Sequence, residues 1–138
     1  QGEDTVAASL AYALVDRARD DIHYASAGHL PPLVLRTDGA VDVLSGGRGP
    51  LLGVRPTAEA PRTAHVSFHR GDTLVLYSDG LVERRDETID DGIARLRDAL
   101  RDRPSMSAGA LRDHLVAALV DPAGLADDVA VFVLRRVG

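Results

Sequence analysis

The sequence contains no cysteine among its 138 residues, which excludes disulfide bonds and metal sites built from thiolates. Lysine is also absent, so all 16 basic residues are arginine, against 21 acidic residues and a net charge of −5. Aromatic residues make up only 4% of the chain, and no basic stripe carries interleaved aromatics. This combination disfavours nucleic-acid binding.

Long apolar runs and the pattern of a signal peptide are missing too. No run approaches the roughly 18–20 apolar residues that a membrane-spanning helix needs. The acidic start, residues 1–4, lacks the basic segment of a signal peptide. We therefore expect a cytoplasmic protein without a membrane association. What the chain does have is a 45% apolar fraction and enough length for one domain with a hydrophobic core, but not for two.

Alternating apolar patterns predict antiparallel β-structure over much of the chain. Strands are expected over residues 5–15, 22–26, 33–36, 41–44, 62–69, 74–78 and 129–135. The pair Asp38-Gly39 is a strong hairpin signal, whereas the glycine-rich stretch 46–53 is expected to be mostly irregular. Leucines and other apolar residues at helical spacing predict two helices, one with Asp90 as its N-cap and one beginning near Ser107. The order of strands, two helices and a final strand predicts an α+β fold, with helices packed on layered antiparallel sheets.

Two aspartates stand at the ends of apolar strand patterns. Asp79 ends the run over residues 74–78, and Asp127 precedes the run over residues 129–134. Both runs are apolar on both alternating faces, which predicts strands inside a covered sheet. If these strands are antiparallel neighbours, Asp79 and Asp127 lie at the same end of the sheet. Two close carboxylates favour a cation between them, and oxygen ligands suit Mg²⁺ or Mn²⁺.

A simpler interpretation is that each aspartate marks a turn at a strand end, where Asp is common. A histidine pair with zinc-like spacing, His65 and His69, is a weaker candidate. On a strand, residues four apart are separated by about 13 Å. These two histidines therefore cannot share one ion, and a solvated strand face explains them better.

Four motifs occur together in one order along nearly the whole chain. They are Tyr24-Ala25-Ser26-Ala27-Gly28-His29-Leu30-Pro31-Pro32, Gly49-Pro50-Leu51-Leu52-Gly53, Gly71-Asp72 followed by the run from Leu74 to Glu83, and Ala126-Asp127-Asp128-Val129. This arrangement closely resembles the C-terminal half of the SpoIIE/RsbU-type PP2C (PPM) serine/threonine phosphatase domain.

The resemblance implies a phosphatase in which two Mn²⁺ or Mg²⁺ ions, held by Asp carboxylates, activate a bridging water. That water attacks phosphoserine or phosphothreonine directly, without a covalent enzyme intermediate. Motif by motif, Asp79 and Asp127 match metal ligands, and Gly80 allows a sharp backbone turn beside Asp79. Asp128 matches the residue that follows the last ligand, as an outer ligand. The implied substrate is a phosphorylated anti-sigma factor antagonist of the STAS type.

One part of the family pattern is missing. The family carries a Gly-Asp-Val-x-Gly-His-Gly-like segment in its N-terminal half, whose Asp bridges both metals, and no residue of this chain matches it. We therefore interpret residues 1–138 as the C-terminal portion of one such domain and expect little or no phosphatase activity from the chain alone. The alternative is a non-catalytic regulatory or protein-binding module with the same fold. Exposed sheet edges would also favour a homodimer of the isolated piece.

Overall fold

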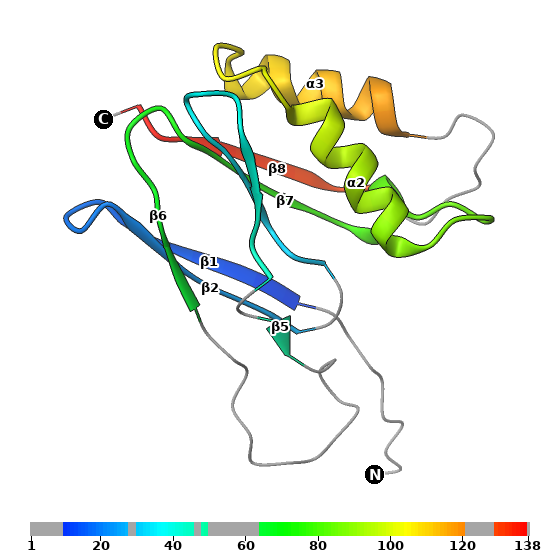
Figure 1. Cartoon of the computed structure of the whole chain (residues 1–138), viewed down its shortest axis with the longest axis horizontal. Coiled ribbons are helices and arrows are strands. Elements are labelled where there is room, and N and C mark those ends of the chain that lie inside the picture. Colours follow the sequence, from blue (N-terminus) through cyan, green and yellow to red (C-terminus); the bar gives the residue numbers. More distant parts are fainter. Residues whose placement is uncertain (1–9, 28–29, 46–47, 50–63, 121–128, 138) are drawn as a thin grey trace, which may run out of the picture. The chain divides into compact units, whose positions relative to one another are not determined.

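The structure is a computed structural model that describes residues 10–27, 30–45, 48–49, 64–120 and 129–137. The chain divides into two compact units (Figure 1). Unit 1 comprises residues 1–31 and 44–68, and unit 2 comprises residues 32–43 and 69–138. Each unit contains one largely antiparallel sheet, and the described helices all belong to unit 2. The predicted α+β class is confirmed.

The sheet of unit 1 is centred on strand β2. Its described strands are β1 (Leu10–Asp16), β2 (Asp21–Ala27), β5 (Arg48–Gly49) and β6 (Ala64–Ser67). Strand β2 pairs antiparallel with β1 and β6 and parallel with β5. The strands predicted over residues 5–15 and 22–26 are present in the described residues as β1 and β2, and they form an antiparallel hairpin. In the stretch 46–53, which was expected to be mostly irregular, Arg48–Gly49 pairs with the end of β2, and the other residues lie outside the described ones.

The two faces of this sheet differ in exposure, as period-two alternation requires. Ile22 and Tyr24 are buried on one face. The residue between them, His23, lies on the other face, opposite Leu14 of β1. Leu14 is 65% exposed, so the face that carries His23 is the one open to solvent at this point.

The sheet of unit 2 has the strand order β4-β3-β7-β8, with antiparallel neighbours throughout. Its strands are β3 (Leu33–Leu35), β4 (Val41–Val43), β7 (Thr73–Tyr77) and β8 (Val131–Arg135). The predicted hairpin between β3 and β4 is confirmed. Its turn depends on Gly39, whose φ of +93° is unfavourable for residues with a side chain, and on Asp38, whose Oδ1 accepts a hydrogen bond from the Ala40 N–H.

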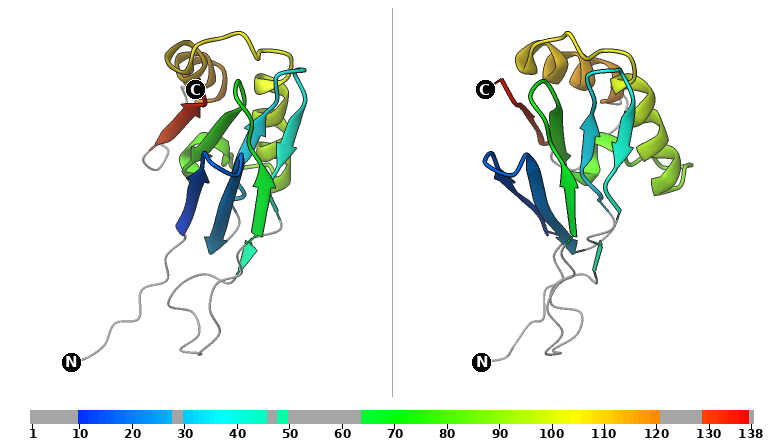
Figure 2. Two further views of the ribbon diagram at one scale, coloured as in Figure 1. Left: turned by 90° about the vertical axis from the view of Figure 1, so that its left-hand side faces the viewer. Right: turned by 60° about the vertical axis from the view of Figure 1, so that its left-hand side comes forward.

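Three helices occur in the described part of unit 2: α1 (Asp79–Val82), α2 (Ile89–Leu100) and α3 (Ala108–Leu119). Helices α2 and α3 lie against one face of the sheet (Figure 2), and both were predicted. Buried leucines line their inner sides at helical spacing: Leu96, Leu100, Leu111, Leu115 and Leu119. Within the described segments, none of the helices has the length and apolar character needed to cross a membrane.

Strand β8 departs from one expectation. The prediction of a covered strand holds for β7, where Leu74 and Val75, on opposite faces, are both buried. It is wrong for β8, because Phe132 is 54% and Leu134 is 37% exposed. Phe132 and Leu134 are two positions apart and therefore share one face of β8, and this face is more exposed than the face that carries Val131 and Val133.

The N-cap of α2 is Thr88 rather than the predicted Asp90. The Thr88 hydroxyl accepts a hydrogen bond from the Asp91 N–H, and the Asp91 carboxylate accepts one from the Thr88 N–H. This reciprocal pair is a capping box. Asp90 is the second residue of the helix, where its negative charge interacts favourably with the positive end of the helix dipole but does not cap the helix.

We expect Thr88→Ala to lower the free energy of unfolding by about 1 kcal/mol, because the Asp91 N–H loses the hydroxyl oxygen that accepts its hydrogen bond. Chemical denaturation monitored by circular dichroism measures the change. The matched control is Asp90→Ala, which removes a charge but no cap and should cost only a few tenths of a kcal/mol. If Asp90→Ala lowers the free energy of unfolding more than Thr88→Ala does, Asp90 and not Thr88 is the N-cap of α2.

Candidate functional site

The predicted site lies where β7 ends and β8 begins. Tyr77 pairs with Val131 at the last rung of the antiparallel ladder. Beyond it, the Ser78 N–H donates to the Ala130 carbonyl at 2.9 Å, and the Ala130 N–H donates to Ser78 Oγ at 2.7 Å. The prediction that these two strands are antiparallel neighbours is therefore confirmed.

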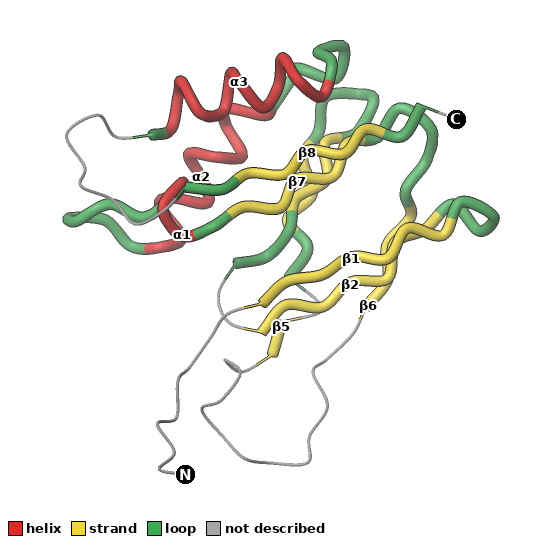
Figure 3. Tube along the Cα trace, turned by 180° about the vertical axis from the view of Figure 1, so that it is seen from behind, coloured by secondary structure: helices red, strands yellow, loops and turns green. Residues whose placement is uncertain are grey.

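Asp79 follows this junction as the first residue of α1, and its side chain is exposed. Figure 3 shows α1 directly after β7, at the end of the strand where β8 starts. The strand itself ends at Tyr77, one residue before the expected end at Ser78, so Asp79 lies two residues beyond the strand rather than directly at its end. Gly80, Leu81 and Val82 are buried and anchor α1, which fixes the backbone that carries Asp79. Gly80 accordingly lies in a helical turn beside Asp79.

The other two predicted residues, Asp127 and Asp128, lie outside the described residues. Ala130, which is bonded to Ser78, follows Asp127 by three positions in the chain. The proximity of Asp79 and Asp127 stays a prediction, supported by the pairing of the strands that they flank.

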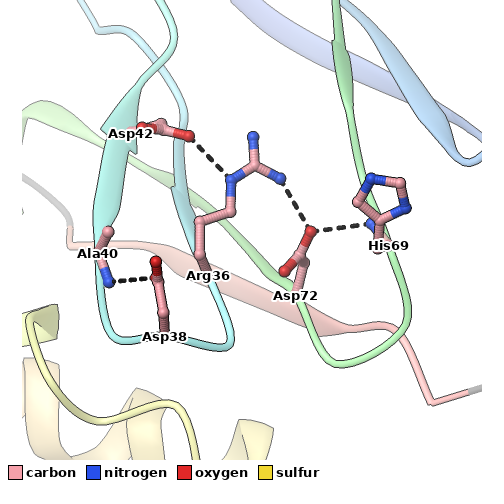
Figure 4. A network of polar contacts seen from close by, with 6 residues as sticks. All are labelled: Arg36, Asp38, Ala40, Asp42, His69 and Asp72. Carbon is pink, nitrogen blue, oxygen red and sulfur yellow. Dashed lines mark hydrogen bonds and ion pairs between the residues drawn. The ribbon is translucent and has the colours of Figure 1, made fainter.

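A second charged cluster lies at the opposite end of β7 (Figure 4). Arg36 donates from Nη1 to Asp72 Oδ2 and from Nε to Asp42 Oδ2, each at 2.8 Å. The same Asp72 oxygen accepts a hydrogen bond from the His69 N–H at 2.8 Å. Burial lowers the pKa of Arg36, but the hydrogen bonds and negative charges of Asp42 and Asp72 outweigh it, so its pKa is raised above the ordinary value. This cluster joins β3, β4 and the start of β7, and its role is structural.

The histidines are arranged differently from the pair considered in the sequence. Strand β6 ends at Ser67, before His69. His65 instead faces His23 across the β2–β6 pairing, and the ring centroids are 5.0 Å apart. Asp21 lies near both, forming a group of three metal-ligating side chains that the sequence analysis missed. The available signal was the Asp-x-His spacing within β2, which puts both side chains on one face.

The sequence profile of the family described as Stage II sporulation protein E (SpoIIE) matches residues 1–137. The chain belongs to the SpoIIE family. The family resemblance inferred from the four motifs is thus confirmed.

Solved structures similar to this SpoIIE-family chain confirm the PP2C-like fold. The RsbU and RsbW domains of a Mycobacterium tuberculosis protein match with 23% identity and a TM-score of 0.70, covering 94% of this chain and 37% of that one. The SiaA-PP2C domain of Pseudomonas aeruginosa matches with 21% identity and a TM-score of 0.71, covering 92% and 51%. The Bacillus subtilis SpoIIE phosphatase domain, presoaked with Mn, matches with 20% identity and a TM-score of 0.62, covering 95% and 57%. The SpoIIE-family chain thus spans between 37% and 57% of these proteins' lengths.

Proposed function

We propose that this chain forms part of a metal-dependent protein serine/threonine phosphatase domain, with Asp79 and Asp127 as metal ligands and Asp128 as an outer ligand. The observation that carries the proposal is the junction of β7 and β8, where Ser78 and Ala130 exchange two hydrogen bonds immediately before Asp79. Membership of the SpoIIE family supports the same assignment.

The donor set fits Mn²⁺ or Mg²⁺, because Asp79 offers exposed carboxylate oxygens and the chain contains no thiolate that would favour a softer metal. When bound, such ions lower the pKa of a coordinated water and neutralise phosphoryl oxygens. The chain's own contribution is positional. The buried side chains of Leu81 and Val82 hold in place the short helix α1, which begins with Asp79.

The proposed substrate is a phosphorylated protein, most specifically a STAS-type anti-sigma factor antagonist in the bacterial cytoplasm. The similar Mycobacterium tuberculosis protein supports this context, because it combines an RsbU domain with an RsbW domain. The chain spans only part of such proteins, and the bridging-Asp segment of the family has no counterpart in it. We therefore expect the isolated chain to turn over p-nitrophenyl phosphate or a phosphopeptide with Mn²⁺ little or not at all.

Calorimetric titration with Mn²⁺ of the full-length protein that contains this chain tests the ligand assignment. Asp79→Asn and Asp127→Asn are each expected to weaken Mn²⁺ binding by at least about 10-fold, because each removes a charged oxygen ligand. Phosphopeptide turnover should fall in parallel. The control is Asp113→Asn, which changes an exposed carboxylate on α3 that pairs with Arg112 and does not belong to the proposed ligand set.

If neither Asp79→Asn nor Asp127→Asn weakens Mn²⁺ binding, the ligand assignment is wrong. If the full-length protein binds no Mn²⁺ or Mg²⁺ at all, the non-catalytic protein-binding module becomes the better description.

A further inference from the structure

Three potential metal ligands share the solvent-facing side of the unit 1 sheet. Asp21 and His23 are two positions apart in β2, so both side chains lie on the same face. His65 of β6 stands directly opposite His23 in the antiparallel register. Directly opposed residues share a face, which brings the third side chain to the same place.

The distances suit a single small ion. One ligand atom from each of the three residues lies within 4.8 Å of the other two. His23 Nε2 is 3.8 Å from Asp21 Oδ1, and the two imidazole rings are tilted at 42° with their centroids 5.0 Å apart. Zinc bonds of about 2.0–2.1 Å put tetrahedral ligand atoms roughly 3.4 Å apart, so modest side-chain rotations would close the group around one ion.

The environment of the Asp21 carboxylate independently favours a cation beside these three side chains. Its Oδ1 is buried and has no hydrogen-bond partner among the described residues. The 3.8 Å separation from His23 Nε2 is too long for a hydrogen bond. A buried carboxylate oxygen without a donor is unfavourable and calls for a specific explanation. Coordination to a metal ion would satisfy this oxygen.

A second carboxylate, Asp16, lies beside the site, and Arg19 Nε is 4.0 Å from its Oδ2, so its charge is partly balanced. Asp16 of β1 pairs directly with Asp21, so its carboxylate lies on the same side of the sheet. Asp16 Oδ1 accepts hydrogen bonds from the Ala18 and Arg19 N–H groups and therefore serves the β1–β2 turn. We take its role as electrostatic support rather than ligation.

From these observations we infer that Asp21, His23 and His65 form a binding site for one divalent transition metal, with Zn²⁺ as the best-suited ion and solvent completing its coordination. Two imidazole nitrogens and one carboxylate oxygen are ligands typical of zinc. The proposed carboxylate site at Asp79 belongs to unit 2 and has the oxygen ligands of a harder ion. The zinc site is independent of the proposed phosphatase function.

Titration of the 138-residue chain with ZnCl₂ by calorimetry tests the site. The expected result is one zinc ion bound per chain at this position. His23→Gln, His65→Gln and Asp21→Asn should each weaken zinc affinity by at least about 10-fold. Loss of a residue that merely supports a metal ligand already lowers metal affinity by about 10-fold or more, and loss of the ligand itself should lower it at least as much. His69→Gln is the matched control, since it removes an exposed histidine just beyond the end of β6 and should leave zinc affinity unchanged. Asp79→Asn should also leave it unchanged, which separates this site from the proposed Mn²⁺ site.

A second measurement needs no substitution. Zinc is diamagnetic, so the ring resonances of the five histidines can be followed by NMR as zinc is added to the unaltered chain. The signals of His23 and His65 should shift together and saturate at one equivalent, while those of His69 and His114 stay in place. Unshifted His23 and His65 signals, no zinc binding, or a zinc affinity in all three ligand variants equal to that of the unaltered chain would each overturn the proposal.

Discussion

Replacing Arg36 with methionine is expected to lower the free energy of unfolding by about 3–5 kcal/mol, because it leaves the buried Asp72 carboxylate without its cationic partner. The Asp72 side chain is only 4% exposed and that of Arg36 17%. Methionine keeps the apolar stem of the arginine, so the loss reports the charge rather than a cavity. Denaturation in urea measures the change.

The two carboxylates around Arg36 provide the internal control. The Asp42 side chain is 53% exposed, and its ion pair with Arg36 is therefore screened by water. Asp42→Asn should cost less than about 1 kcal/mol. A loss for Arg36→Met as small as that for Asp42→Asn would show that Asp72 is stabilised by the His69 N–H and does not need the guanidinium.

The raised pKa of Arg36 also predicts how the contribution of its charge to the free energy of unfolding depends on pH. A basic group whose pKa is higher in the folded state contributes stability that is complete below its unfolded pKa and is lost only as pH rises through the folded value. For Arg36 the pH range in which this stability is lost lies above the ordinary, strongly basic pKa of arginine. The difference between the unaltered chain and Arg36→Met should therefore stay constant between roughly pH 6 and pH 9.

The sequence predicted the local elements well because their signals are local. Asp38-Gly39 identified the β3–β4 hairpin, and the leucine spacing identified α2 and α3. The ion-pair partners of Arg36 could not be predicted from such local signals. Asp72 lies 36 positions further along the chain and meets Arg36 only because β3 pairs with β7. Hydrophobic patterns indicate which strands exist, whereas their order in the sheet depends on tertiary packing.

The same limit explains the outcome at the two candidate metal sites. The neighbouring β7 and β8 were correctly predicted, but the four residues of α1 are too few to display helical periodicity, so Asp79 was assigned to the strand end. For the histidines, sequence spacing drew attention to His65 and His69. The structure instead brings together His65 and His23, which lie 42 positions apart, and only the β2–β6 register reveals that pairing.

Gly92→Ala is expected to lower the free energy of unfolding by about 2 kcal/mol or more, although alanine is the better helix former. Gly92 lies in the first turns of α2, where a Cβ atom would come within 2.0 Å of the Val82 carbonyl oxygen and 2.8 Å of its carbon. These are backbone atoms of the last residue of α1, so they cannot rotate out of the way. The two helices would have to separate, and overpacking of this kind outweighs the roughly 1 kcal/mol gain in helix propensity.

Gly109→Ala in α3 is the matched control, because Gly109 also lies near a helix start but a Cβ there would meet nothing within 4 Å. That substitution should be neutral or stabilise the chain by up to about 1 kcal/mol. Since α1 begins with Asp79, displacement of α1 by Gly92→Ala should also weaken Mn²⁺ binding by the full-length protein, whereas Gly109→Ala should leave it intact. Equal stability of the two variants would mean that α1 can shift at little cost. In that case the buried Leu81 and Val82 do not fix the position of Asp79, and the rigid junction behind the proposed metal site would have to be abandoned.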